Sequence, residues 1–319
     1  MTAIKKKSAK RPASLSHGRP PQRFGQKPPA SLSAKATRAL IRKHHHLQKE
    51  LAKALSSGDG ALARTLEIQI EQHGGLKSYQ QASITGQSSE RGGDSSRVLM
   101  EWLTPVHAAL RARAKEENGE QKLRLLEVGA LSKSNACSRS GLFDVSRIDL
   151  NSQDESSILQ QDFMERPLPA AEHDTFDVIS LSLVLNYVPD AVTRGEMLRR
   201  TCQFLRHRQA AAGAVEKEGG APPEPALFPS LFLVLPLPCI NNSRYLDRQK
   251  LHSIMTSLGY ILVHEKTTAK LVYYLWRCEP QAPSTSASTS SNGRPRSQTF
   301  KKVEVHPGKT RNNFAIILR

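Results

Sequence analysis

The residues best suited to chemistry in this chain are a glutamate, a glycine and an aspartate at the ends of two strand-like segments. Glu127 lies in the apolar segment 123–128, Gly129 directly follows it, and Asp149 ends the next such segment, twenty positions after Gly129. In a doubly wound sheet, a glycine after the first strand lets a ligand approach the backbone, and an acid ending the second strand accepts hydrogen bonds from ribose hydroxyls. The spacing predicts a nucleotide-type site, although strand packing alone is an equally simple explanation for such residues.

Two further runs place polar and aromatic side chains at the same predicted sheet edge. Asp162 and Phe163 follow a third strand-like segment, where a carboxylate can accept a hydrogen bond from an adenine amino group beside an apolar wall. A fourth segment, residues 176–183, contains Ser182 and leads into a loop with Asn186 and Tyr187. The four pieces follow one another in the order that a nucleotide-binding sheet requires.

The sequence after the first strand-like segment lacks a pyrophosphate-binding motif. A dinucleotide enzyme needs Gly-x-Gly-x-x-Gly to hold the pyrophosphate at a helix N-terminus, whereas Gly129 is followed by Ala130, Leu131, Ser132 and Lys133. A cofactor with a cationic sulfonium needs no such seat and tolerates Glu127 near its amino group. The pattern therefore disfavours a dehydrogenase.

The elements that must position these residues alternate between strand-like and helical patterns. Apolar runs at residues 123–128, 145–150, 157–160, 176–183 and 231–236 predict a parallel sheet, and residues 97–116, 193–207 and 246–258 are helical in pattern. Residues 260–265, 270–276 and 313–318 are strand-like, and we expect the last of them to close the fold after an insertion inside a hairpin. The expected fold is α/β: a Rossmann-like, mostly parallel sheet with a C-terminal antiparallel hairpin.

Composition divides the chain into three parts. Residues 1–33 are predicted to be a disordered basic arm, residues 34–96 a helical extension and polar loop, and residues 97–319 the main domain, with flexible insertions at about 207–226 and 281–299. Within the extension, glycines at positions 58 and 60 separate two predicted helices. The polar loop either caps the following helix through Asp94 or Ser95 or forms a lid that faces the substrate.

The net charge of +17 is concentrated at the two ends of the chain. Residues 1–53 contain 14 Lys or Arg and one acid, residues 279–319 contain 7 and 2, and the stretch between them contains 25 and 26. An acidic partner is therefore expected. The arm suits a nuclear address or nucleic-acid contact, with a solvated tail as the alternative. A basic helix face is compatible with phosphate contact or with simple solvation, and comprises Arg38, Arg42, Lys43, Lys49 and Lys53.

Several classes of protein are excluded by composition. The four cysteines lie too far apart for a metal site or a dense disulfide framework. Three consecutive histidines, at positions 44–46, would point in different directions on a helix, so no metal is expected. No apolar run reaches the length of a membrane span, and the N-terminus lacks the apolar region of a secretory signal.

Five longer sequence motifs resemble those of the fungal nucleolar large-subunit (25S) ribosomal RNA adenine-N1 methyltransferases, which are class I S-adenosylmethionine-dependent enzymes. The resemblance covers residues 34–319 apart from the two insertions, and the motifs are far more specific than a glycine loop. They lie at residues 76–83 with 91–96, 148–152, 161–164, 234–245 and 307–314.

The resemblance implies S-adenosylmethionine as the cofactor, an adenine of large-subunit rRNA as the substrate, and the nucleus and nucleolus as the location. Gly129 and Asp149 fall on the family's cofactor-binding positions. From the residues themselves, we add four cofactor-binding candidates, which are Glu127, Asp162, Phe163 and Ser182. The basic arm is expected to contact the rRNA or the pre-ribosome.

The acceptor loop departs from that of adenine-N6 methyltransferases. Those enzymes carry an Asn/Asp-Pro-Pro-aromatic word after the fourth strand, whereas this chain has Asn186, Tyr187, Val188 and Pro189. As catalytic candidates, Tyr187 could stack on an unpaired adenine and Asn186 could bond its edge, with loop packing as the alternative. Arg244 either reaches a phosphate or caps the next helix together with Ser243.

A binding module is the main alternative to an enzyme. Related folds keep the cofactor pocket while serving as S-adenosylmethionine sensors, and Gly129 with Asp149 cannot separate the two. The basic ends favour an RNA methyltransferase.

Overall fold

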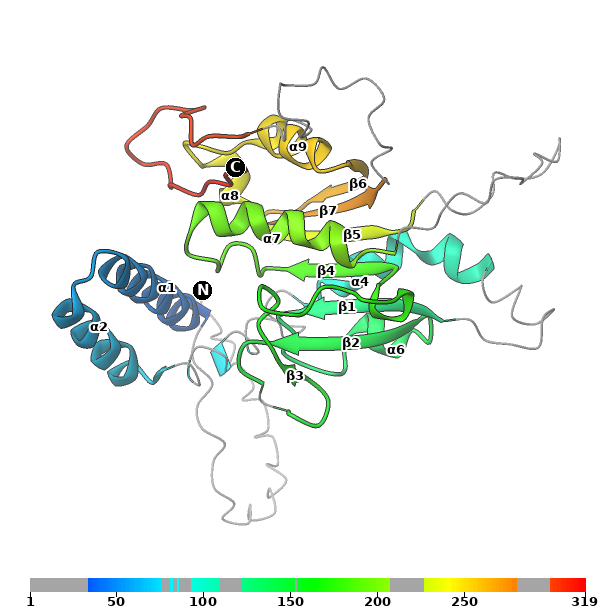
Figure 1. Ribbon diagram of the computed structural model, residues 1–319, viewed down its shortest axis with the longest axis horizontal. Helices are drawn as coiled ribbons and strands as arrows, with labels where there is room; N and C mark the ends of the chain where they lie inside the picture. Colours follow the sequence, from blue (N-terminus) through cyan, green and yellow to red (C-terminus); the bar gives the residue numbers. More distant parts are fainter. Residues whose placement is uncertain are drawn as a thin grey trace, which may run out of the picture.

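A seven-stranded sheet forms the centre of the protein (Figure 1). The computed structural model describes residues 34–75, 93–109, 122–152, 154–206, 227–279 and 299–319, together with positions 78, 81, 82 and 85. The strand order is β3-β2-β1-β4-β5-β7-β6. The strands are β1 (Leu123–Val128), β2 (Phe143–Asp149), β3 (Leu159–Gln160), β4 (Val178–Ser182), β5 (Ser230–Pro236), β6 (Tyr260–Thr267) and β7 (Leu271–Cys278).

Strand direction confirms the expected α/β fold. β1 runs parallel to β2 and β4, β2 to β3, and β4 to β5, whereas β7 runs antiparallel to both β5 and β6. β4 and β5 are buried along almost their whole length. Continuous apolar runs of this kind are typical of parallel strands that are covered on both faces.

Helices cover both faces of the sheet and bury a separate core on each. On one face, Met197 and Leu198 of α7 (Ala191–Phe204) and Ile254 of α9 (Arg248–Ser257) pack against the strands. On the other face, Leu99 of α4 (Ser96–Trp102) and Cys137 of α6 (Ala136–Arg139) do so. The short helix α8 (Pro238–Asn241) follows β5, and a 3-10 turn spans Glu172–Asp174. The sheet is therefore held rigidly between two layers.

The predicted helical extension is a hairpin of α1 (Ala34–Ser56) and α2 (Gly60–Gln72). Gly58 turns the chain with a φ of 74°, and Asp59 caps α2 by accepting a hydrogen bond from the Leu62 amide at 3.0 Å. The two helices bury Leu47, Ala54, Ala63 and Leu66 between them. In Figure 1 the hairpin lies beyond the edge toward which β1, β2 and β4 point.

The predicted last strand is wrong. Residues 313–318 form no strand of the sheet, and their contacts include a hydrogen bond from the Ile317 amide to the Ala191 carbonyl of α7 at 2.9 Å. Gly195 of α7 permits this approach, since a Cβ there would lie 1.9 Å from the Ile317 carbonyl oxygen. The antiparallel hairpin is β6–β7, whose turn is short, so the insertion at residues 281–299 follows the hairpin instead of interrupting it.

Smaller differences concern element lengths. The helix predicted at residues 97–116 begins as α4 and continues as a second turn at residues 104–109, after which residues 110–121 are outside the described part. β3 has only two residues, because the chain around it turns through loops on both sides. The predictions of disorder at residues 1–33, 207–226 and 281–298 also fall outside the described residues.

Candidate active site

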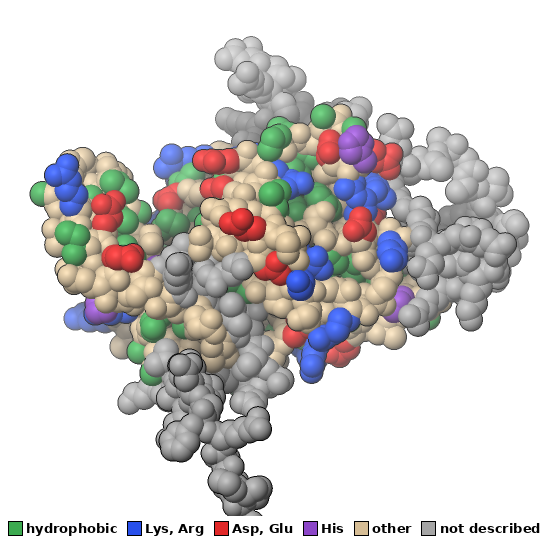
Figure 2. Space-filling view, turned by 90° about the horizontal axis from the view of Figure 1, so that it is seen from below, with side chains coloured by type: hydrophobic (Ala, Val, Ile, Leu, Met, Phe, Trp, Pro, Cys, Tyr) green, Lys and Arg blue, Asp and Glu red, His purple; other side chains and the backbone are tan. Residues whose placement is uncertain are grey.

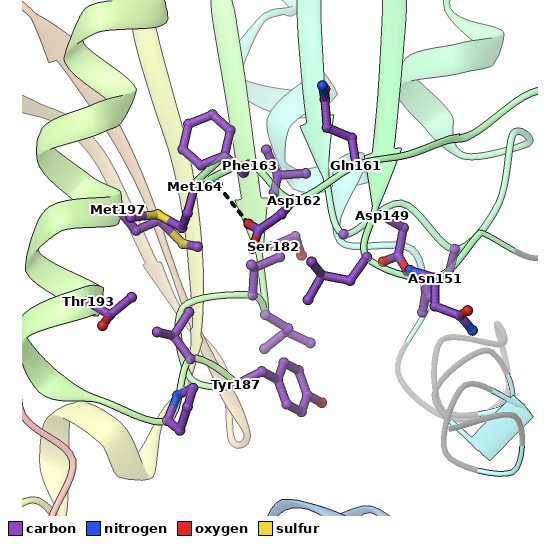
Figure 3. Close-up of a pocket in the computed structure, with 18 of the residues that line it drawn as sticks. Asp149, Asn151, Gln161, Asp162, Phe163, Met164, Ser182, Tyr187, Thr193 and Met197 are labelled. Atoms are coloured by element: carbon purple, nitrogen blue, oxygen red, sulfur yellow. Dashed lines mark hydrogen bonds between the residues drawn. The ribbon is translucent and has the colours of Figure 1, made fainter. Parts of the chain in front are cut away.

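A cavity of about 500 Å³ opens at the carboxyl ends of the central parallel strands (Figure 3). β1 lies between β2 and β4, so the cavity stands where the connections diverge to opposite sides of the sheet. Open parallel sheets bind ligands at this position, and the volume suits a small-molecule cofactor. Its walls are mainly apolar, with a few polar groups contributed by Asp149, Asn151, Gln161, Asp162 and Ser182.

Gly129 brings bare backbone to the cavity wall. Its φ of 74° is a left-handed conformation that glycine adopts without strain, and a Cβ there would lie 2.6 Å from the Val184 Cγ2 atom. The Gly129 amide donates a 2.8 Å hydrogen bond to the Ile148 carbonyl, which fixes the turn against β2. The turn thus has no room for any side chain, as the sequence predicted for a close ligand approach.

Asp149 ends β2 at the neighbouring wall. Its Oδ1 atom accepts a 2.8 Å hydrogen bond from the Asn151 amide, which holds the carboxylate at the cavity edge. In Figure 3 Asp149 and Asn151 lie together on one side of the cavity, opposite Thr193 and Met197. This is the geometry in which a strand-end acid receives the two hydroxyls of a ribose.

Asp162 and Phe163 form the wall after β3. Asp162 Oδ1 accepts the Met164 amide at 2.7 Å, and its side chain borders the cavity. Phe163 is buried and packs on Phe204 of α7 with ring centroids 5.4 Å apart. One residue thus supplies a polar group and the next an apolar surface, and their role as an adenine-binding wall stays a prediction.

Ser182 connects the end of β4 to the segment before α4. Its hydroxyl lies 2.7 Å from the Ser95 hydroxyl, and Gly93, Ser95 and Ser182 all line the cavity. Asp94 fixes this segment by accepting hydrogen bonds from the Ser96 amide at 2.9 Å and the Ala136 amide at 2.6 Å. Asp94 therefore caps α4, whereas Ser95, the other predicted cap, forms no side-chain cap bond.

Glu127 lies beneath the cavity instead of lining it. Its Oε1 accepts a 2.7 Å hydrogen bond from Asn135 Nδ2, and its Oε2 is 3.9 Å from Arg147 Nε, too far for a hydrogen bond. Burial raises the pKa of Glu127 to about 7, against the opposing effects of Asn135 and Arg147. A cofactor-binding role for Glu127 stays a prediction.

The acceptor loop after β4 brings Tyr187 to the cavity but leaves Asn186 behind it. Tyr187, Val188 and Pro189 line the wall. Asn186 does not, and its Oδ1 atom is buried with no hydrogen-bond partner among the described residues. The side-chain oxygen of Asn186, next to Tyr187 in the same loop, is of the type that accepts a hydrogen bond from an adenine amino group. The catalytic roles of both residues stay predictions.

Arg194 of α7 holds this loop in place. Its guanidinium is buried and donates to the carbonyls of Val188 at 2.9 Å, Pro189 at 3.2 Å and Ala315 at 2.7 Å. It also lies over the Phe314 ring, 4.5 Å from the centroid. Burial lowers the pKa of Arg194 to about 10, so the group stays charged at neutral pH. One cation joins the acceptor loop to the segment around Phe314.

Arg244 does not cap the next helix, whereas its predicted contact with a phosphate stays a prediction. Its Nε donates to the Gly308 carbonyl at 3.0 Å, and the following helix α9 is capped by Asp247, which accepts from the Lys250 amide at 2.8 Å. Ser243 donates to the Phe314 carbonyl at 2.5 Å. Both residues therefore fix the segment 305–314 against the loop after α8.

Sequence reasoning missed the part of the wall that comes from residues outside the parallel strands and the loops that follow them. Ile41 of α1 lines the cavity, as do Gly93 from the polar loop and Leu271 at the start of β7. No local pattern marks them, since an isoleucine on a helix or a glycine in a loop has no recognisable spacing. Gly93 and Ser95 reach the cavity, and the lid interpretation of the polar loop stays a prediction.

The described residues contain neither a helix that could span a membrane nor a cluster of metal ligands. None of the described helices is both long and apolar enough to cross a lipid bilayer. In the same part of the chain, no three His, Cys, Asp or Glu side chains gather as metal ligands.

Comparison with known proteins gives close relatives. The chain is 39% identical over 282 residues to the 25S rRNA adenine-N(1) methyltransferase of Schizosaccharomyces pombe, covering 87% of this chain and 89% of that protein. It is 36% identical over 279 residues to the 25S rRNA (adenine(2142)-N(1))-methyltransferase of Saccharomyces cerevisiae, covering 86% and 70%. A solved 1,6-didemethyltoxoflavin-N1-methyltransferase of Burkholderia thailandensis matches with a TM-score of 0.37 at 12% identity, covering 63% of this chain and 87% of that one.

The sequence model of one family, described as 25S rRNA (adenine(2142)-N(1))-methyltransferase, Bmt2, matches residues 64–316. The match spans the whole sheet, the acceptor loop and the cavity-lining residues other than Ile41, and it confirms the resemblance seen in the sequence. The chain belongs to the 25S rRNA adenine-N1 methyltransferase family.

Proposed function

We propose that this protein transfers a methyl group from S-adenosylmethionine to N1 of one adenine in large-subunit rRNA. The observation that carries the proposal is the cavity itself, in which the Gly129 turn and the Asp149 carboxylate stand on adjacent strands with Tyr187 at the same opening. Family membership supplies the substrate class and the acceptor atom.

The residues present fit S-adenosylmethionine. The turn at Gly129 admits close approach to the backbone, Asp149 is placed for the ribose hydroxyls, and Asp162 with Phe163 is placed for the adenine. Bound there, the cofactor supplies a methyl carbon on a cationic sulfur, and the carbon–sulfur electron pair leaves with the sulfur as the new carbon–nitrogen bond forms. Among the described residues lining the cavity, no cation faces this site to oppose that charge.

The chain needs no general base to prepare the acceptor. N1 of adenine carries a free lone pair, so alignment of the nucleophile with the methyl group supplies most of the acceleration. Because N1 lies on the pairing edge, the base must be unpaired and turned into the cavity. Tyr187 then stacks on the ring and the apolar side chains of Val184 and Val188 exclude water, whereas Asn186, which does not line the cavity, would have to turn before its Oδ1 could accept from the amino group.

The finer aspects of recognition and location belong to the same proposal. The basic arm at residues 1–33 contacts rRNA phosphates in the pre-ribosome, and the protein works in the nucleolus. The arm's charge supports this, since it holds eight Lys or Arg and no acid. The rival function, a sensor that binds the cofactor without transfer, has no support from the relatives, which are both methyltransferases.

The decisive experiment follows the methyl label. Purified protein is incubated with methyl-labelled S-adenosylmethionine and unmodified large-subunit rRNA, and the labelled nucleoside is identified. We expect the label in 1-methyladenosine. The test variant is Asp149→Ala, and its matched control is Asp144→Ala, an exposed aspartate on the same strand.

Each outcome has a clear meaning. Loss of the label in Asp149→Ala but not in Asp144→Ala supports the ribose role together with the reaction. Cofactor binding by the wild-type protein without any transfer to RNA would replace the enzyme with the sensor. Label in another nucleoside would keep the enzyme and overturn its acceptor atom.

A further inference from the structure

Helix α1 contributes one of its sides to the catalytic cavity. Ile41 lines the cavity, and the neighbouring residues Thr37 and His44, four positions before it and three after, are buried. These three residues share one side of the helix, whereas Leu47 and Ala54 farther along face α2. The first half of α1 therefore packs toward the site and its second half toward the hairpin partner. In Figure 3 α1 passes just beyond Tyr187.

The opposite side of α1 carries a continuous row of basic side chains. Arg42, His46, Lys49 and Lys53 follow one another at intervals of four, three and four positions, and all four are exposed. This spacing puts them on a single helix face. We call this row the α1 basic row. Glu50 is the one acid of the helix, and it pairs with Lys53 at 2.7 Å on the surface.

The α1 basic row reaches the acceptor side of the cavity. Although the Lys49 side chain is largely exposed, burial of part of it lowers the pKa of its ammonium, and the positive charge of Arg194 in α7 lowers that pKa further. Arg194 is the residue that holds the acceptor loop through Val188 and Pro189. One cation of the row therefore lies near the residue that holds the acceptor loop, and the row as a whole lies on the helix that contributes Ile41 to the cavity wall.

The charge of α1 stands out from that of the main domain. Residues 54–278 hold 25 basic and 26 acidic residues, and Figure 2 shows both signs interspersed over the face of the body that it presents, with the α1–α2 hairpin projecting at its left. A row of cations beside an otherwise balanced surface suits a polyanion better than an acidic protein patch, because phosphates repeat at regular intervals along a strand.

We propose that α1 is an RNA-docking element of the active site. The α1 basic row binds the phosphates that flank the target nucleotide, and Ile41 closes the acceptor end of the cavity against the inserted base. This inference rests on the proposed function, because it takes the substrate to be RNA with one base turned into the cavity.

The first test measures RNA binding instead of methyl transfer. The affinity of Arg42→Gln/Lys49→Gln for unmodified large-subunit rRNA is measured over a range of potassium chloride concentrations. Each lost phosphate contact reduces the slope of log affinity against log salt by about 0.7 to 0.9, so we expect a slope lower by about 1.5 than in wild type. The matched control is Lys122→Gln/Arg139→Gln, which removes two exposed cations from positions away from the cavity.

The second test separates the two ends of the cavity. In Ile41→Ala we expect kcat/KM for rRNA to fall about tenfold while the Kd of S-adenosylmethionine stays unchanged. The control Leu55→Ala changes an exposed aliphatic residue on the same helix, with no expected effect on either constant. The melting temperature of each variant checks that the hairpin remains folded.

The outcomes distinguish this inference from the proposed function. A slope unchanged by Arg42→Gln/Lys49→Gln, or equally changed by the control pair, would overturn the docking role while 1-methyladenosine still forms. An Ile41→Ala variant that loses cofactor affinity instead of RNA turnover would assign Ile41 to the cofactor end. Failure of the wild-type protein to label adenine would overturn the proposed function itself, and the salt-dependent binding would still report on α1.

Discussion

At the scale of single residues, the site depends on groups whose backbone or protonation state is unusual. Gly129 and Gly141 have nearly the same left-handed φ, 74° and 73°, but only Gly129 faces the cavity and has Val184 against it. Glu127 has a pKa near neutrality because burial outweighs its hydrogen bond from Asn135. Both features are accessible to substitution.

The two glycines form a matched pair for a first prediction. Alanine at either position carries the left-handed conformational cost of about 1–2 kcal/mol, but Gly129→Ala also puts a methyl group 2.6 Å from Val184. We expect Gly129→Ala to weaken S-adenosylmethionine binding at least tenfold in calorimetry and Gly141→Ala to leave it unchanged. Equal loss of affinity in both variants would mean that Gly129 is needed for its left-handed backbone conformation and not for the space that it leaves to the ligand.

The raised pKa of Glu127 makes the free energy of unfolding depend on pH. Its folded pKa of about 7 lies above the unfolded value, so its contribution is fully present below about pH 4.5 and is lost as the pH rises toward 7. The loss is of the order of 3 kcal/mol. Glu127→Gln cannot ionise, and we expect its advantage over wild type to grow between pH 5 and pH 8 in urea unfolding. Parallel pH profiles for the two proteins would contradict this explanation.

At the scale of elements, α7 is the part on which the acceptor loop depends. Its N-terminal half supplies Thr193 and Met197 to the cavity, and Arg194 between them binds carbonyls from two other segments. Its Gly195 admits the backbone of residue 317. A short stretch of one helix thus positions the wall of the site and the segment packed behind it.

The energetic weight of this connection can be measured with two arginines of α7. Arg194→Met leaves three carbonyls without their donor, of which that of Ala315 is buried, and we expect the free energy of unfolding to fall by about 2–4 kcal/mol. Arg199→Met removes a half-buried arginine that pairs with Glu196 and donates to the Arg319 carbonyl, with an expected change of about 1 kcal/mol. Urea denaturation of both variants measures the two free energies of unfolding. Similar decreases would mean that the hydrogen bonds of Arg194 contribute no more to stability than those of Arg199.

The elements also show what could be predicted from sequence. The predicted strand 123–128 coincides with β1, and the runs leading to β4 and β5 were found because fully buried strands are continuously apolar. Residues 313–318 misled the prediction, because burial against α7 requires the same apolar side chains as burial in a sheet. Strand-end residues such as Asp149 were predictable from position, whereas Ile41 entered the site only through the packing of a distant helix.

At the scale of the whole molecule, charge and catalysis are divided between different parts. The sheet domain carries the cavity with nearly balanced charge, and the excess basic residues belong to residues 1–53 and 279–319. Cofactor affinity and RNA affinity should therefore respond to different changes in the chain.

Removal of the basic arm tests this division. We expect deletion of residues 1–33 to weaken rRNA binding and to lower its salt dependence, because eight cations are removed. The Kd of S-adenosylmethionine should not change, since the cofactor-binding candidates all lie between Glu127 and Ser182. Filter binding over a salt series and calorimetry measure the two quantities. An unaltered salt slope would remove the arm from RNA recognition.

The hydrogen bond from Arg194 to the Ala315 carbonyl has a consequence for the order in which the site folds during translation. The two residues are 121 positions apart, so a nascent chain presents Arg194 and the whole acceptor loop long before the carbonyl that completes their support exists. Until position 315 has been translated, Arg194 lacks one of its three carbonyl acceptors, and the cofactor turn at Gly129 can form before this connection does. Maturation of the site therefore proceeds from the cofactor side to the RNA side, and methyl transfer should start only once the segment around Phe314 has docked on α7.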